Sequence, residues 1–164
     1  MPRRADVSLL FDLFVASQRV RRVLADGMAG SGMRPDEYAA YSLLFEAGPL
    51  TATEMARQLG TPLSTVLDYL KTMNQAGHLR RLPHPNDGRA LQLALNARGV
   101  AAHRRANQHW EIVRKQIESA LAVSAADVRK SLQALDDAAA AALASSVRAE
   151  PVRKRGHEVR RQAR

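Results

Sequence analysis

Residues 61–95 read TPLSTVLDYLKTMNQAGHLRRLPHPNDGRALQLAL, and this stretch decides the fold. Apolar residues recur at helical spacing after Thr61 and Pro62, which suit the N-cap and the first position of a helix. A helix is therefore predicted over about 62–76, with Gly77 ending it. Its inward face is expected to consist of Leu63, Val66, Leu67, Leu70 and Met73.

The second half of the stretch predicts a β-hairpin over about 78–95. Its later strand alternates apolar and polar residues, and Asn86-Asp87-Gly88 supplies residues that tolerate the positive φ angles of tight turns. Upstream, Thr51 and Glu54 have capping-box spacing and open a short helix that ends at Gly60. Two helices with a glycine at the corner, followed by a hairpin, form a winged helix-turn-helix.

Long helices are predicted on both sides of this domain. Helical periodicity indicates one helix over about 6–27, and a second helix begins at Pro35. Downstream, Asn96 is expected to cap a helix that reaches about residue 121, and Ser124 opens a last helix. The chain is thus predicted to be mainly α, with a winged helix-turn-helix over 34–95 and a basic tail over 148–164. The helical segments 1–33 and 96–147 are predicted to form a dimerisation region, because the apolar stripes of the terminal helices need a partner surface.

The chain of 164 residues carries 25 Lys and Arg against 16 Asp and Glu, a formal net charge of +9. Two segments hold this excess: 51–106 has eight basic and three acidic residues, and 148–164 has seven and two. Cysteine is absent, which excludes disulfides and thiolate chemistry. A cytoplasmic protein without a membrane partner is expected, because acidic residues interrupt the first apolar run and no apolar run is long enough to span a bilayer.

The segment HLRRLPHPNDGRAL at 78–91 resembles the wing of the MarR family (multiple antibiotic resistance regulators), with the D-x-R signature at Asp87 and Arg89. LNARG at 95–99 and LSTV at 63–66 are similar to that family as well, and the order of elements matches it from about residue 7 to 147. Gly88 and Asn96 stand where other residues are commoner, and the basic C-terminal extension lies outside the family's core.

The resemblance implies a sequence-specific transcriptional regulator that binds double-stranded DNA. It also implies a homodimer whose terminal helices interlock, so that two winged helices meet successive major grooves of a palindromic operator. A repressor is expected, released by a small anionic aromatic or phenolic effector. The outward face of the 62–76 helix and the wing supply the predicted DNA contacts: Ser64, Thr65, Asp68, Tyr69, Lys71, Thr72, Arg80, Arg81, Asp87 and Arg89.

The resemblance further implies an effector cleft between the DNA-binding domain and the dimerisation helices. Its predicted lining is Tyr38, Tyr41, His109 and Trp110, and core packing is the competing role for these large rings. No metal or other cofactor is predicted, because no histidine has another at i+3 or i+4. An enzyme is not expected, since the chain has no nucleophile elbow or phosphate loop. An architectural DNA-binding protein with little sequence choice and no effector is the alternative.

Overall fold

The computed structural model describes residues 8–148, and within that range it describes all side chains except those of 87–89 and 146–148. The chain divides into two compact units, one ending at Ser119 and the other beginning at Ala120. The predicted basic tail lies outside the described residues apart from its first one, Arg148. Among the described helices, none combines the length and the apolar character that crossing a membrane requires.

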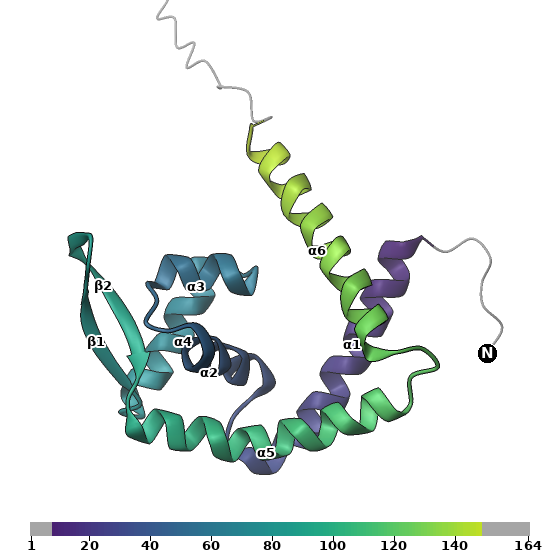
Figure 1. Ribbon diagram of the computed structural model, residues 1–164, viewed down its shortest axis with the longest axis horizontal. Coiled ribbons are helices and arrows are strands. Elements are labelled where there is room, and N and C mark those ends of the chain that lie inside the picture. Colours follow the sequence, from purple (N-terminus) through teal and green to yellow (C-terminus); the bar gives the residue numbers. More distant parts are fainter. Residues whose placement is uncertain (1–7, 149–164) are drawn as a thin grey trace, which may run out of the picture. The chain divides into compact units, whose positions relative to one another are not determined.

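The fold is mainly helical with one antiparallel hairpin, as the sequence predicts (Figure 1). The described part of the second unit contains one helix, α6, over Ala125–Arg148. The first unit contains, in chain order, α1 (Leu9–Met28), the short 3₁₀ turn η1 (Ala29–Ser31), α2 (Pro35–Ala47), α3 (Ala52–Leu59), α4 (Leu63–Gln75), β1 (Leu79–His84), β2 (Asp87–Leu95) and α5 (Ala97–Ser119).

Most helix starts follow the capping residues in the sequence. Pro35 is the first residue of α2, and at the start of α3 the Thr51 hydroxyl accepts a hydrogen bond from the Glu54 N–H at 3.2 Å. The Glu54 carboxylate in return accepts from the Thr51 N–H at 2.7 Å. The start of α4 differs by one residue: Pro62 has an extended ψ of 144° and is itself the N-cap, so the helix begins at Leu63.

The core of the first unit lies where α2, α3, α4, β2 and the start of α5 meet. From α4 it receives Val66, Leu70 and Met73. Leu63 and Leu67 were predicted to face inward too, and this is wrong: their exposed fractions are 43% and 52%. The helix buries only the stripe that faces its neighbours, whereas Leu67 lies on the flank nearer the hairpin.

The corner between α3 and α4 depends on Gly60, whose φ of +60° lies in the left-handed region that glycine adopts without strain. Beyond α4, β1 and β2 pair in antiparallel register from Leu79 opposite Leu95 to Pro83 opposite Leu91. Leu50, just before α3, adds a short bridge to this hairpin, since it exchanges two backbone hydrogen bonds with Leu93. The hairpin is therefore fastened to the helix-turn-helix at its base.

Asn96 joins the hairpin to α5. Its Oδ1 accepts a hydrogen bond from the Gly99 N–H at 3.0 Å, which is the predicted helix cap, and its Nδ2 donates to the carbonyls of Gly77 and Leu79 at 2.9 and 3.3 Å. Gly99 is buried directly beside the backbone carbonyl of His78, where a Cβ would collide with it. The Asn96 side chain and the close approach that Gly99 allows thus hold the base of the hairpin against α5.

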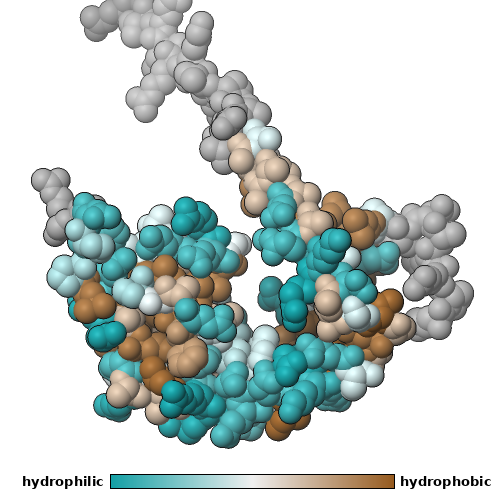
Figure 2. Space-filling model, viewed as in Figure 1, coloured by the Kyte–Doolittle hydropathy of each residue, from teal (hydrophilic) through white to brown (hydrophobic). Residues whose placement is uncertain are grey.

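Helix α1 packs against α5 but leaves much of its apolar surface uncovered. Hydrophobic side chains reach the surface along this part of the first unit (Figure 2). Six large apolar residues of this one helix are exposed, with exposed fractions from 38% to 68%: Leu9, Leu10, Phe11, Phe14, Val20 and Val23. In the second unit, Leu132 and Leu143 of α6 are 52% and 70% exposed.

Candidate nucleic-acid interface

Helix α4 has one outward face that is free to contact a ligand. Ser64, Asp68, Lys71 and Thr72 are exposed on it, while Thr65 is half-buried. The Thr72 hydroxyl donates to the Asp68 carbonyl of the same helix at 3.2 Å, which leaves the Asp68 carboxylate available. These predicted contact residues therefore share one surface, and it carries hydroxyl, carboxylate and ammonium groups that match base edges and phosphates.

Tyr69 lies apart from this set. Its ring packs against the core, and its hydroxyl donates a hydrogen bond to the Asp36 carboxylate at the start of α2 at 3.3 Å. Burial and the nearby Asp36 raise the pKa of Tyr69. The structure thus gives this side chain a packing role between α4 and α2.

The hairpin separates the two adjacent arginines that the sequence assigns to the wing. Successive side chains of a strand point to opposite faces. Arg81 pairs with Leu93 and shares its face with Leu79 and Leu91, whereas Arg80 pairs with Ala94 on the other face. Only Arg81 therefore lies on the side that faces α4. The backbone of Asp87 and Arg89 begins β2, and their side chains lie outside the described part of the structure.

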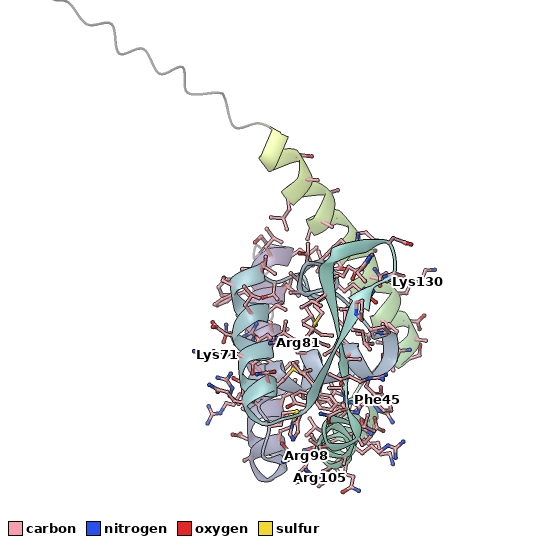
Figure 3. All side chains as sticks on the ribbon, turned by 90° about the vertical axis from the view of Figure 1, so that its left-hand side faces the viewer. Phe45, Lys71, Arg81, Arg98, Arg105 and Lys130 are labelled. Atoms are coloured by element: carbon pink, nitrogen blue, oxygen red, sulfur yellow. The ribbon has the colours of Figure 1, made fainter. Side chains whose placement is uncertain are left out.

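A groove of about 530 Å³ runs between α4 and the hairpin. In Figure 3, which is turned toward this side of the molecule, Lys71 belongs to the helix and Arg81 to the strand. The charged residues in the lining are both cationic, and the rest of the lining is mainly apolar: Ala52, Leu67, Leu70, Asn74, Leu79, Leu91 and Leu93. The groove is thus a positively charged, partly apolar continuation of the outward face of α4.

The four residues predicted to line an effector pocket are divided between two places. Tyr38 is buried, stacks on Trp110 at 4.7 Å between ring centroids, and donates a hydrogen bond to Asn107 at 2.6 Å. His109 lies 3.4 Å from the Gly27 carbonyl oxygen through its Nδ1. These three residues join α1 and α2 to α5, in contacts that suit packing.

Tyr41, the fourth, lines a cavity of about 220 Å³ together with two residues that sequence reasoning missed, His78 and Arg105. The Tyr41 hydroxyl and His78 Nδ1 are 2.7 Å apart. Burial, aided by Arg98 and Arg105, lowers the pKa of His78, and burial raises the pKa of Tyr41. The phenol and the imidazole therefore share one hydrogen bond inside the cavity. Nothing in the local sequence signals this grouping, because the three residues come together only in the folded chain.

The helix-turn-helix, the fastened hairpin and the cationic groove define a winged helix-turn-helix protein. The MarR family model matches residues 35–91, from the start of α2 into β2. Over these residues the chain is similar to the MarR family, whose members are transcriptional regulators rather than enzymes. An HTH-type transcriptional regulator of Mycobacterium tuberculosis is 28% identical over 109 residues, which cover 65% of this chain and 76% of the relative.

Solved structures share this architecture. A probable transcriptional regulator from Pseudomonas aeruginosa matches with a TM-score of 0.68 and 26% identity, over 80% of this chain and 98% of the other. The Mycobacterium tuberculosis regulator MosR, crystallised with DNA, matches with a TM-score of 0.71 and 20% identity, over 83% and 98%. A MarR family protein of the same organism, crystallised with salicylic acid, matches with a TM-score of 0.60 and 22% identity, over 81% and 97%.

Proposed function

We propose that this protein is a homodimeric repressor that binds a palindromic DNA operator through α4 and the hairpin, and that a small aromatic acid releases it. The observation that carries the proposal is the continuous surface formed by the outward face of α4 and the cationic groove beside it. A helix with exposed hydroxyl and carboxylate groups fits base edges in the major groove, and Lys71 and Arg81 beside it fit phosphates. The similarly folded MosR was crystallised with DNA, which supports DNA as the ligand.

Footprinting on the DNA that flanks the protein's own gene tests the DNA-binding step. A protected palindrome with half-sites about one helical turn apart is expected. Affinity for this site should exceed affinity for random DNA about 10³-fold or more at physiological salt. An architectural protein would instead bind both DNAs alike, and that result would refute sequence-specific regulation.

Arg81 and Arg80 provide a matched pair of variants for the same assay. Arg81→Gln removes the cation that faces α4, whereas Arg80→Gln removes one from the opposite face of the hairpin. If the groove contacts phosphate, Arg81→Gln should weaken binding more and reduce the salt dependence by about one phosphate contact. Equal effects of the two variants would contradict the proposed orientation.

The homodimer is supported by the uncovered apolar surface of α1. A helix with six exposed large apolar residues needs a partner surface, because an uncovered apolar patch is unfavourable in water. The exposed leucines of α6 point to the same requirement in the second unit. Phe14, 60% exposed on α1, is the residue to change.

Light scattering coupled to size exclusion tests this step. The wild-type chain should elute as a dimer, and Phe14→Glu should shift it to a monomer, because a buried unpaired carboxylate is strongly disfavoured at an apolar interface. Gln75→Glu introduces the same charge at an exposed position of α4, away from the apolar surface of α1, and is the control for charge alone. A wild-type monomer would contradict the proposal.

The effector step is supported by the cavity at Tyr41, His78 and Arg105. Arg105 makes no ion pair within the described residues, so its guanidinium is available to a carboxylate, while Met33, Met73 and Ala102 supply apolar lining. Glu37 also lines the cavity, and its carboxylate is paired with Arg34 at 3.2 Å. A small aromatic acid matches this combination, and the salicylic acid complex of a relative with the same fold supports this ligand class.

Release of the operator by salicylate and related phenolic acids tests this step. Arg105→Met should abolish release and leave operator affinity in the absence of ligand unchanged. Arg104→Met, at the exposed neighbouring position, is the matched control and should respond like wild type. Undiminished release from the Arg105→Met variant would exclude this cavity as the effector site.

A further inference from the structure

Leu67 is an exposed apolar residue at the border between the polar outward face of α4 and the groove. Its exposed fraction is 52%, although the core begins at its immediate neighbour Val66, which is fully buried. On the helix surface Leu67 lies next to Ser64 and Lys71, at spacings of three and four residues. An apolar side chain therefore sits among the groups proposed to read and hold DNA.

The surroundings of Leu67 specify what can cover it. Leu67 forms part of the α4 wall of the groove, and Leu91, 54% exposed, forms part of the hairpin wall. The charged residues that line the same groove, Lys71 and Arg81, are both cationic. The ligand must therefore combine an apolar feature with flanking negative charge.

Duplex DNA has this combination in its major groove. The C5-methyl group of thymine is the apolar feature that distinguishes it there from the other bases, and the phosphates on either side carry the negative charge. We propose that Leu67 is a specificity-determining residue that selects a thymine in each half-site by contact with its methyl group, while Lys71 and Arg81 hold the adjacent phosphates. This inference rests on the proposed operator binding and adds a reading mode that uses no hydrogen bond.

Replacement of single thymines by deoxyuridine in the footprinted operator tests the inference, because the change removes only the methyl group. With the wild-type protein, one thymine of the half-site should be sensitive, and its replacement should weaken binding about fourfold, the effect of losing one buried methyl group. This measurement uses the unaltered protein, so it does not depend on the folding of a variant.

The Leu67→Ala variant then assigns the effect to its residue. It should bind the thymine operator more weakly than wild type and bind the thymine and deoxyuridine operators equally. Lys71→Gln is the matched control on the same helix face: it should weaken binding to both operators and keep the fourfold ratio. Thermal unfolding of both variants verifies that they are folded.

Three results would overturn the inference. An operator in which no thymine methyl affects affinity would remove its basis, and a fourfold ratio retained by Leu67→Ala would assign the methyl contact to another residue. A change of oligomeric state in Leu67→Ala, without a change in DNA affinity, would make the groove an interface between copies of the chain. In each case sequence-specific binding by the wild type would persist, whereas its absence would refute the proposed function itself.

Discussion

The amide of Asn96 offers the sharpest test of how the hairpin is held. Asn96→Ala removes three hydrogen bonds: the cap on the Gly99 N–H at 3.0 Å and the two bonds donated to the carbonyls of Gly77 and Leu79 at 2.9 and 3.3 Å. Loss of an N-cap costs about 1 kcal/mol. The two donated bonds add about 1.5 kcal/mol, since neutral bonds contribute about 1 kcal/mol each and one of these is long. The free energy of unfolding should therefore fall by about 2.5 kcal/mol.

Urea unfolding followed by circular dichroism measures this loss. Asn96→Asp keeps the acceptor for the Gly99 N–H but removes both donors, so it separates the hairpin bonds from the cap and should still cost about 1.5 kcal/mol or more. Ser124→Ala removes a cap of the same type at α6, where the Ser124 hydroxyl accepts from the Asp127 N–H at 3.1 Å, and should cost about 1 kcal/mol or less. An Asn96→Ala loss no larger than that of Ser124→Ala would refute the reasoning.

Three further predictions follow from single contacts. Gly99→Ala should lower the free energy of unfolding by about 1–3 kcal/mol in the same urea assay, because the Cβ of alanine would collide with the His78 carbonyl. This loss should exceed the gain from the better helix propensity of alanine, and a stabilised variant would contradict the prediction. Burial lowers the pKa of His103 below its unfolded value of about 6.5, so the unfolded chain binds more protons and the free energy of unfolding should decrease as the pH is lowered through that value. The melting temperatures at pH 7.5 and 5.5 should therefore differ less in His103→Phe than in wild type. An equal difference would exclude His103 as the cause. Tyr69→Phe removes the bond to Asp36 and should leave operator affinity, measured by fluorescence anisotropy, within about twofold of wild type; a larger change would show that the hydroxyl contacts DNA.

The order and type of the elements could be predicted from the sequence, because their signals are local. Pro35 begins a helix since its ring suits the first helical position, and Thr51 and Glu54 cap each other across one turn. The hairpin is likewise predicted from turn residues and from alternation, and β1 and β2 lie within the predicted range of 78–95. Such features depend on residues a few positions apart.

Which residues of α4 are buried could not be predicted from the sequence. Leu63 and Leu67 fit the apolar periodicity of α4 as well as Val66 and Leu70 do, yet only the latter pair is buried. Periodicity identifies a helix but not which part of a broad apolar face its neighbours cover. The packing of α2, α3 and β2 decides that, and it leaves Leu67 on the groove.

The winged helix-turn-helix, the capping box of α3 and the concentration of basic residues in 51–106 can all be predicted from the sequence, because each arises from residues close together in the chain. Only the tertiary structure decided that Arg81 faces α4 while Arg80 faces away, and that Tyr41, His78 and Arg105 share one cavity. Strand register sets the first arrangement and the packing of α2 on α5 sets the second. The first depends on how the hairpin packs against α4, and the second joins residues that are far apart in sequence, so neither has a local signal.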